Sequence, residues 1–429
     1  MKKEYRIILY TSIFLLCVVA SIILVVKKSN SVYEEESKPK VVKHKSMLSM
    51  NLEQTAGSGD YKTVTQSSWP TEGYKFNAEL SKCENGSTLS WDDTKKAVIV
   101  SGNLSDKCYV YFDIYQPTLA EYIKSQYTGT QGENNIYYHD SDLANGAGDN
   151  SYRYAGANPN NFVCFGTTES PCPTDNLYRI IGVFGENYHG VTGKQLVKLI
   201  KYDYMTTDEL GTDGDYSQTY KEWGMDSTYK GTYGDGERIG VYYWNYKATG
   251  SATNTWSTSL LNKTNLNTNF INNIGTTWAN KIATVTWKVG GNTWANIGTK
   301  TSSVAYTNEI TNPVTTNTTD NATTYSAKIG LMYVSDYGFA ASPDAWTLTM
   351  SSYNNTTATN NNWMYMGLYE WTISRDAAGS DYAFIVDRGG YVNSYGVGYY
   401  SGVRASFNLE SSVSYVSGSG SMSDPIVIN

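Results

Sequence analysis

The chain has 429 residues and a net charge of −7, and only 17% of its residues are charged, against about a quarter in typical soluble proteins. Such a chain lacks the clustered Lys and Arg that nucleic acid binding needs, which excludes that class of partner. Tyr outnumbers Phe by 38 to 10, and a Tyr ring packs while its hydroxyl stays hydrated. With long Asn/Thr/Ser/Gly stretches, this composition predicts a β-rich, loop-rich extracellular protein.

The first apolar segment predicts a membrane anchor. Residues 7–26 carry no charge, and about 20 such residues span a bilayer core. Lys2, Lys3 and Arg6 precede the segment, and a short N-terminal tail generally stays in the cytoplasm. We therefore expect a cytoplasmic tail (1–6), a single-pass transmembrane signal-anchor (7–26) in the cell membrane, and an extracellular location for the rest. A cleavable signal peptide is the competing interpretation, but it needs a shorter apolar region and a small-x-small cleavage site.

The cysteines beyond this segment predict two disulfides. Cys83 with Cys108 and Cys164 with Cys172 form sequence-local pairs, although four cysteines allow three connectivities. Outside the cell such cysteines are expected to be oxidised. The first bridge would contribute roughly 3 kcal/mol in the chain-entropy model. A zinc site is the alternative, but the sequence has no Cys-x-x-Cys and no nearby histidine cluster.

Composition and pattern divide the next part of the chain into three regions. Residues 27–56 are polar and of mixed charge, which is typical of a flexible stalk. Residues 57–115 hold short strand-like runs between Asn-Gly, Asp-Asp and Gly-Asn turns, which predicts a small antiparallel β module pinned by a disulfide. Residues 116–175 begin with a short helix, PTLAEYIKSQY, and continue as a loop-rich connector.

The remaining residues, 176–429, predict a larger mixed domain with irregular loops, so that the chain as a whole is α+β and β-rich. A helix is expected from Trp256, although its many Asn residues are poor helix formers and packing must hold it. The stretch 295–325 is rich in Thr and Asn and is expected to be a loop. Strands are expected at 177–184, 196–200, 281–289, 382–386 and 403–409.

This larger region resembles a bacterial domain of unknown function. The order LYRIIGVF, VKLI, W-S-x-S-L-L-N, LMYVSDYG and a final GVRASFNL is similar to that domain in uncharacterised surface proteins of low-GC Firmicutes and mollicute-like gut bacteria. The domain usually ends in Gly-Val-Arg-Pro, and here Ala405 replaces the Pro; the segment from Trp371 also departs from the family's Trp-Trp-Leu-Arg-Ser.

More distantly, a Trp-x-x-Ser strand, a Tyr-Ala-Phe-Ile-Val strand and a closing Val-Arg strand look like the C-terminal part of C-type-lectin-like folds, to which the formylglycine-generating enzymes belong. The resemblance implies a C-type-lectin-like architecture for 176–429. The catalysis does not carry over, because those enzymes act through cysteines near the end of the fold and no cysteine follows Cys172. The calcium-dependent sugar motifs Glu-Pro-Asn and Trp-Asn-Asp do not occur either.

A search for catalytic motifs predicts a non-enzymatic protein without a cofactor. The sequence has three His and contains no Gly-x-Ser-x-Gly, HExxH or GxxxxGK[ST] motif. The enzymatic alternative is a secreted hydrolase of cell-wall or host glycans that uses Asp381, Asp387 or His139. A pilin-like structural subunit is a further alternative, although the anchor lacks the Gly-Phe-Thr-Leu-x-Glu signature of pilin processing.

One segment, HDSDLANGAGDN, has the character of a cation site. Asp140, Asp142, Asn145 and Asp149 could donate oxygen ligands to a hard cation such as calcium. The EF-hand spacing fails, because Ala144 holds the fifth position of an Asp-x-Asp loop and no Glu holds the twelfth. Asp, Asn and Gly clusters are also common turn formers.

A second segment, between Gly390 and Gly402, predicts a ligand-binding loop. Exposed Tyr among Ser, Gly and Asn is typical of adaptable recognition surfaces, and a glycan or a protein ligand would suit it. The plain alternative is a long hairpin filled with residues that abound throughout the chain. The candidate ligand-binding residues are Tyr391, Asn393, Tyr395, Tyr399 and Tyr400.

Two residues next to this loop are expected to be structural. Trp371 should be a buried strand residue, and the fork of Arg404 should pair with a carboxylate or with carbonyls at the base of the loop. The leading hypothesis is therefore a membrane-anchored surface protein whose C-terminal domain binds a glycan or protein ligand. A remoter hypothesis is that 393–401 is a hypervariable patch.

Overall fold

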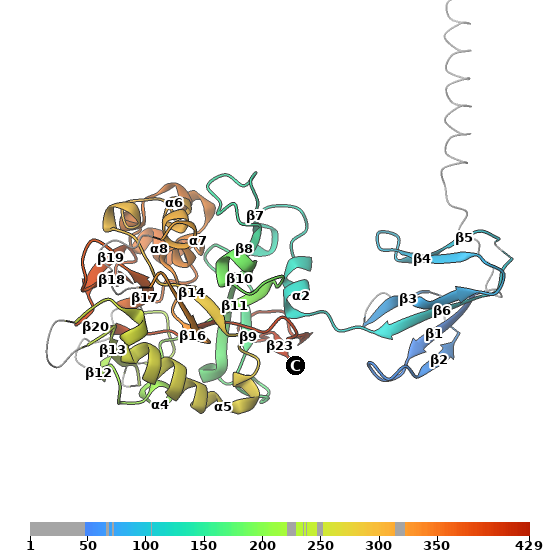
Figure 1. Ribbon diagram of the computed structural model, residues 1–429, viewed down its shortest axis with the longest axis horizontal. Helices are drawn as coiled ribbons and strands as arrows, with labels where there is room; N and C mark the ends of the chain where they lie inside the picture. The colour runs from blue at the N-terminus through green and yellow to red at the C-terminus, as the bar shows by residue number, and fades with distance from the viewer. Residues whose placement is uncertain are drawn as a thin grey trace, which may run out of the picture. The chain divides into compact units, whose positions relative to one another are not determined.

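The computed structural model divides the chain into two compact units, Met1–Tyr115 (unit 1) and Gln116–Asn429 (unit 2). The described residues are 48–429, apart from 66–67, 71–72, 104, 221–228, 235, 237, 247–251 and 314–321. The expected tail (1–6), signal-anchor (7–26) and first part of the stalk lie outside them. Among the described residues, no helix is long and apolar enough to cross a bilayer. The described chain is α+β and β-rich, as expected (Figure 1).

Unit 1 contains a four-stranded sheet with the strand order β2-β1-β6-β3, and β4 and β5 form a hairpin. β1 runs parallel to β6, whereas β2 and β3 pair antiparallel with their neighbours. The sheet buries Met50, Leu52, Val110 and Phe112, which form the core of the unit. The strands are β1 (Leu48–Glu53), β2 (Tyr61–Val64), β3 (Tyr74–Cys83), β4 (Thr88–Asp92), β5 (Ala97–Ser101) and β6 (Cys108–Ile114).

The expected stalk boundary at 56 is wrong, because β1 lies inside the expected stalk. The run LSMNLE alternates apolar and polar residues, which is a strand pattern. Its parallel partner β6 pairs Leu48 with Cys108, which lies 60 positions later in the chain, so the two strands meet only after the intervening segment has folded back. A strand that depends on such a distant partner is easily missed next to a mixed-charge stretch.

Unit 2 holds two larger sheets. One has the order β16-β21-β11-β10-β8-β7, with β9 also paired to β10, and the other has the order β12-β13-β20-β17-β18-β19. In Figure 1, β10 and β11 pass through the middle of the unit, with α6, α7 and α8 on one side of the view and α4 and α5 on the other. A single large apolar cluster, which includes Phe184, Leu199, Trp371 and Phe407, joins the two sheets.

The bounds of these elements agree closely with several expected ones, such as β10, β11 and β18. The strands are β7 (Ile136–His139), β8 (Ser151–Tyr154), β9 (Phe162–Cys164), β10 (Leu177–Phe184), β11 (Leu196–Lys201), β12 (Tyr216–Thr219), β13 (Gly240–Tyr243), β14 (Val285–Lys288), β15 (Thr324–Ala327), β16 (Ile329–Gly330), β17 (Glu370–Arg375), β18 (Tyr382–Val386), β19 (Val392–Gly396), β20 (Tyr400–Gly402), β21 (Ser406–Asn408), β22 (Tyr415–Ser417) and β23 (Val427–Ile428). The helices are α2 (Leu119–Ser125), α3 (Glu186–His189), α4 (Thr207–Leu210), α5 (Ile271–Ala279), α6 (Ser302–Tyr306), α7 (Val334–Phe339) and α8 (Asn355–Asn361), the π-helical η5 (Leu261–Phe270) and η7 (Thr307–Thr311), and the short 3₁₀ turns η1 (Glu133–Asn135), η2 (Thr174–Asn176), η4 (Trp256–Thr258), η6 (Trp294–Asn296), η8 (Pro343–Thr347) and η9 (Met350–Ser352).

The region 116–175 is an integral part of unit 2 and not a connector, so the expected boundary at 176 is wrong. β8 and β9 both pair with β10. α2 forms as expected, with Thr118 and Glu121 completing a capping box at its first turn. Its Leu119 N–H donates to the Val413 carbonyl, which ties the start of the unit to its end. Strands of three and four residues between Gly/Asn loops carry too little periodicity to be recognised in the sequence.

The expected helix at Trp256 forms as η5 and α5, and its polar residues explain how it is held. Asn265 donates from Nδ2 to the Leu210 carbonyl at 2.8 Å and accepts from the Asp215 N–H at 3.0 Å. Asn267 makes a similar pair of bonds to the Ile329 main chain, both at 3.0 Å. The buried amides therefore replace helix propensity with bonds to neighbouring segments.

The expected loop at 295–325 is partly helical. α6 and η7 lie in it, and Ala305, Tyr306 and Ile310 are buried. A short helix with only a few apolar residues resembles a Thr/Asn-rich loop in sequence, and only its packing against α7 reveals it.

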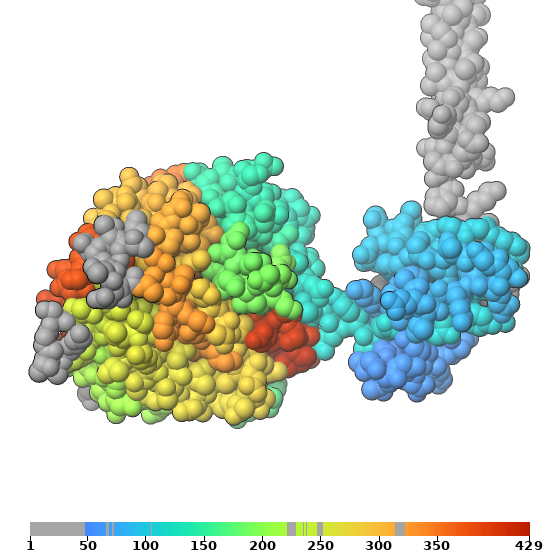
Figure 2. All heavy atoms as spheres, in the orientation of Figure 1, coloured from blue at the N-terminus to red at the C-terminus, as the bar shows by residue number. Residues whose placement is uncertain are grey.

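Both expected disulfides are present. Cys83–Cys108 joins register partners on β3 and β6, and Cys164–Cys172 closes a loop between β9 and η2. The chain end is also fixed, because Lys281 donates from Nζ to the Asn429 carbonyl. Figure 2 shows this last segment, in red, on the surface of unit 2 between parts coloured green and yellow.

The disulfides lead to a labelling prediction. The chain is isolated from cells under conditions that trap its thiols, and is then unfolded and alkylated. Before reduction, the reagent should modify none of Cys83, Cys108, Cys164 and Cys172, because all four are paired. After reduction, mass spectrometry of tryptic peptides should find all four modified. Modification of any of the four before reduction would contradict the pairing.

Candidate functional site

The β18–β19 hairpin displays the expected ligand-binding residues along one strand. β18 pairs with β19 so that Ala383 lies opposite Tyr395 and Ile385 opposite Asn393. Because side chains alternate along a strand, Asn393 and Tyr395 share one face, and Tyr391 precedes them in the same phase. Burial raises the pKa of Tyr391, and the nearby Asp387 carboxylate adds to the effect. Three of the five expected residues therefore lie on one strand face.

On this face three tyrosine rings form a row, which we call the tyrosine row (Tyr369, Tyr395 and Tyr399). The rings of Tyr369 and Tyr395 lie 6.2 Å apart with an interplanar angle of 26°, and those of Tyr395 and Tyr399 lie 5.1 Å apart. Tyr399, in the turn after β19, is 62% exposed. The Arg388 guanidinium lies 5.9 Å from the centre of the Tyr369 ring, so a cation stands at the other end of the row.

Tyr400, the fifth expected residue, does not join the tyrosine row. It pairs with Tyr243 across β20 and β13, and their rings lie 6.1 Å apart. Tyr246 stacks on Tyr243 at 4.4 Å and is 45% exposed. The register places Tyr400 on the same face as Val241 and Gly402, opposite to Tyr395. The expected set is thus divided between two faces of one sheet.

Sequence reasoning missed Tyr243, Tyr246 and Tyr369. A local signal existed only for the first two, in the run VYYWNY of 241–246. Tyr369 stands 26 positions before Tyr395 in the chain and reaches it only through the pairing of β17, β18 and β19. Its place in the row is a consequence of topology.

Buried side chains fix the strands beneath the tyrosine row. Trp371 is fully buried and donates from its indole N–H to the Tyr242 carbonyl at 2.8 Å. Arg404, for which a carboxylate or carbonyl partners were expected, donates to both oxygens of Glu370, at 2.8 Å from Nε and 2.9 Å from Nη2. Arg404 also donates to the Met364 carbonyl at 2.6 Å. This bidentate pair ties β17 to the segment after β20.

The expected calcium ligands point in different directions. Asp140 accepts the main-chain N–H groups of Asp142 and Leu143, both at 3.0 Å, and so caps a turn. Asp149 turns inward to Arg153, with Nη2 donating at 2.7 Å, and Asn145 is exposed. No group of three or more His, Cys, Asp or Glu side chains within the described part of the chain is arranged to hold a metal ion. Calcium binding at these residues stays a prediction.

The residues of the hydrolase alternative lie on different sheets. His139, on β7, is fully buried against Phe339 and Trp346, with ring centroids at 4.9 and 5.2 Å, and burial lowers its pKa well below the ordinary value. Asp381 and Asp387 flank β18 in the other sheet, and Asp387 accepts the Gly389 N–H at 2.8 Å within a turn. The structure does not bring these three residues together.

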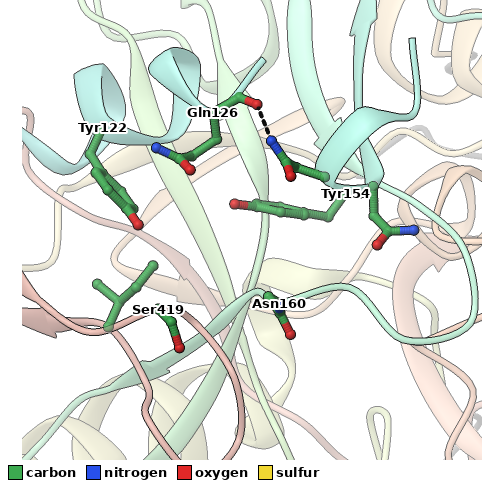
Figure 3. A pocket seen from close by; sticks show the side chains of 8 residues that line it. Tyr122, Gln126, Tyr154, Asn160 and Ser419 are labelled. Carbon is green, nitrogen blue, oxygen red and sulfur yellow. Dashed lines mark hydrogen bonds between the residues drawn. The ribbon is translucent and has the colours of Figure 1, made fainter. Parts of the chain in front are cut away.

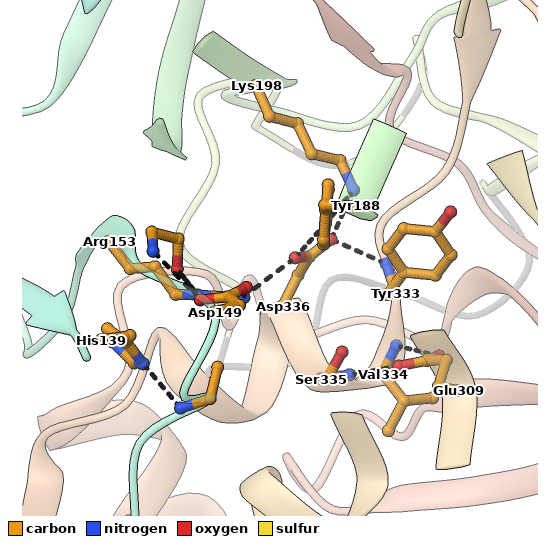
Figure 4. Close-up of polar contacts among 12 residues, drawn as sticks. His139, Asp149, Arg153, Tyr188, Lys198, Glu309, Tyr333, Val334, Ser335 and Asp336 are labelled. Atoms are coloured by element: carbon orange, nitrogen blue, oxygen red, sulfur yellow. Dashed lines mark hydrogen bonds and ion pairs between the residues drawn. The ribbon is translucent and has the colours of Figure 1, made fainter. Parts of the chain in front are cut away.

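A buried charge cluster lies between the seven-stranded sheet and α7 (Figure 4). Asp336, on α7, accepts from Lys198 Nζ at 2.6 Å and from the Tyr188 hydroxyl at 2.5 Å. Arg153 Nη1 lies 3.8 Å from Oδ1 of Asp336, the oxygen that accepts from Tyr188, and Arg153 also pairs with Asp149. Two cations thus face two carboxylates, of which Asp149 keeps some exposure, at 12%. Burial lowers the pKa of Lys198.

Next to this cluster, Glu309 on η7 is fully buried, and within the described chain none of its hydrogen bonds comes from a basic side chain. Its carboxyl accepts the N–H groups of Val334 and Ser335, both at 2.9 Å, and the Ser374 hydroxyl. Burial, which penalises the charged form, raises the pKa of Glu309 to about 7. The residue therefore changes charge near neutral pH while it holds α7 to β17.

The comparisons with known proteins leave the site to be interpreted from its own residues. No family model, no curated protein and no solved structure matches the chain. The resemblance to a C-type-lectin-like domain therefore stays a prediction. What the structure provides is an exposed aromatic row and, elsewhere in unit 2, a buried charge cluster.

Removal of the central carboxylate tests the buried charge cluster. Asp336→Asn should lower the free energy of unfolding by about 3–5 kcal/mol, because it leaves Lys198 and Arg153 buried without their shared partner. The matched control is Asp175→Asn, whose pair with Arg238 is 43% and 47% exposed and should cost under about 1 kcal/mol. Urea unfolding followed by Trp fluorescence measures both. Equal losses in the two variants would contradict the assigned role.

Glu309 should make stability fall as pH rises. Its pKa is higher in the folded than in the unfolded chain, so between pH 4.5 and about 7 the folded state binds more protons. Raising the pH through that window therefore lowers the free energy of unfolding, by about 3 kcal/mol over the whole window. The difference in unfolding free energy between the native chain and Glu309→Gln, measured at several pH values, should decline across this window. A constant difference would contradict the raised pKa.

Proposed function

We propose that this chain is a non-catalytic ligand-binding protein of the cell surface, and that the tyrosine row contacts the ligand. The observation that supports the proposal best is the 62% exposure of Tyr399 at the end of three rings spaced 5.1 and 6.2 Å apart. An exposed aromatic side chain gains little from folding, whereas it offers a large contact area to a ligand at low cost in conformational entropy.

A glycan is the ligand class that fits this surface best. Sugar rings have apolar faces that stack on Tyr rings, and their hydroxyl groups need neutral hydrogen-bonding partners. Asn393 shares the strand face with Tyr395 and supplies an amide, and Arg388 supplies donors at the Tyr369 end. The underlying β17–β18–β19 strands are held by the buried Trp371, so the row is pre-organised.

The proposal also covers the location of the protein and the architecture of unit 2. An uncleaved anchor at 7–26 and two disulfides suit a chain whose bulk is outside the cell. We assign a C-type-lectin-like architecture to unit 2 from 176 onward. Its support is the original sequence pattern together with two sheets linked by long irregular segments and a chain end that pairs with the start of the unit.

The test is glycan-array binding by residues 48–429. At least one glycan should bind, and Tyr395→Ala/Tyr399→Ala should weaken that binding by about tenfold or more, since two ring contacts of about 1 kcal/mol each are lost. The matched control is Tyr138→Ala on β7, where the ring stacks on Tyr152 at 4.6 Å in the other sheet. Unchanged binding in the double variant, or equal weakening in the control, would reject the tyrosine row as the site.

A further inference from the structure

Unit 2 contains a pocket of about 290 Å³ that shares no residue with the tyrosine row (Figure 3). This volume is at the lower end of the roughly 300–1,000 Å³ typical of small-molecule sites. One wall is formed by Tyr122 of α2 and by Gln126, which caps the end of that helix, and the opposite wall includes Tyr154 at the end of β8. Ser419 and Ile426, from the chain end, close the base. The pocket therefore suits one compact ligand.

The chemistry of the walls is neutral and polar. Every lining residue except Ile426 carries an amide or a hydroxyl, and none carries a carboxylate, ammonium or guanidinium group. Burial raises the pKa of Tyr122 to about 12 and that of Tyr154 still further, so both hydroxyls stay protonated. A charged ligand would find no countercharge in these walls, and a wholly apolar ligand would leave the amides unsatisfied.

Tyr154 gives the pocket an unused hydrogen-bonding group. The residue is 4% exposed, and its hydroxyl points into the cavity toward Tyr122 (Figure 3). Within the described residues, its main-chain carbonyl accepts from the Trp363 indole at 2.9 Å, but no hydrogen bond is made by its hydroxyl. Because this hydroxyl faces the cavity and has no partner there among the described residues, its hydrogen bonds are left to water or to a ligand.

The loop before β7 is strained where it meets the pocket. Asn134 and Asn135 both have positive φ, at 57° and 59°, and both line the cavity. Two consecutive non-glycine residues in the left-handed region are costly. Asn134 is held there by a bond from its Nδ2 to the Gln126 carbonyl at 2.9 Å. The strain therefore places amide side chains at a cavity where Gln126 and Asn160 already supply two more.

We propose that this pocket binds one neutral sugar unit. Each sugar hydroxyl both donates and accepts, and an amide with its adjacent oxygen and nitrogen can serve two neighbouring hydroxyls at once. Four amides and two Tyr hydroxyls around about 290 Å³ match a ligand that is dense in hydroxyls and carries no charge. The unit is either a free monosaccharide or the end of a glycan, since the recognising chemistry is the same.

The experiment uses the full-length chain and saturation-transfer NMR with a panel of monosaccharides. Neutral hexoses and N-acetylhexosamines should include a binder, while glucuronic acid and glucosamine should not bind detectably. Methyl glycosides form a second arm: retained binding indicates the end of a glycan, and lost binding indicates a free reducing sugar. Absence of binding by every neutral sugar, or equal binding of the charged ones, overturns the proposal.

Two variants test whether the sugar binds in the pocket. Tyr154→Phe removes only the hydroxyl and should weaken binding about tenfold, the value of one hydrogen bond in a buried site, with no loss of thermal stability because that hydroxyl has no bond to the described chain. Asn160→Ala should also weaken binding. Because Asn160 is exposed, this variant replaces the first one if Tyr154→Phe misfolds. Unchanged binding in the variant that folds overturns the proposal.

Tyr395→Ala/Tyr399→Ala should leave this monosaccharide binding unaltered. The same double variant is expected to lose glycan-array binding, so failure of the tyrosine row and failure of the pocket give different patterns. Monosaccharide binding that depends on Tyr395 and Tyr399 but not on Tyr154 would assign the sugar to the tyrosine row and overturn the pocket.

Discussion

The buried carboxylate of Asp336 is the interaction on which unit 2 depends most. It brings Lys198 of β11, Tyr188 of α3 and Arg153 of β8 to a single point on α7. Burying charged groups costs several kcal/mol per ion unless each is paired and hydrogen-bonded, so the arrangement is stable only when every partner is in place. The aromatic rings of Phe184 and Phe339 lie 4.7 and 4.9 Å from the Arg153 guanidinium and cover it from water. One polar centre thus specifies how the helices pack on the sheet.

The tyrosine row and the pocket are supported by different parts of unit 2. α7 contacts both β17 and β18, so the strands that carry the row rest on the helix that holds Asp336. The pocket instead forms where α2, the strained Asn134–Asn135 turn and the chain end meet. Because Leu119 and Val413 are joined main chain to main chain, the pocket walls come from both ends of unit 2. Strands packed on a helix support the tyrosine row, whereas a helix end and loops form the pocket.

Elements with a local signature could be predicted from the sequence. β10 is a mostly apolar run, α2 follows a proline and has apolar residues on one side, and β18 lies between turn residues, so each was expected at nearly its observed bounds. The disulfide pairs followed from sequence proximity. The tyrosines of β19 were identified as a candidate site because they are adjacent in the chain, but their division between two faces depends on strand register, which the sequence does not display.

What could not be predicted depends on distant partners. Lys198 in LVKLIK resembles any strand lysine, and its carboxylate partner is 138 positions away. Tyr154 and Ser419 are separated by most of unit 2 and meet only in the folded chain. β1 carried an alternating pattern, but its meaning depended on β6. In each case the local sequence does not indicate the partner, and only the tertiary structure determines which residues meet.

The parallel pairing of β1 with β6 has a mechanical consequence. The described part of unit 1 begins at Leu48, the start of β1, and β6 ends at Ile114, just before unit 2. Tension between the two ends would pull these neighbouring strands along their length in opposite directions, so the hydrogen bonds from Leu48–Cys108 to Leu52–Phe112 would bear the load together and not one after another. The parallel pairing therefore makes the contact between β1 and β6 resistant to shear between these two ends.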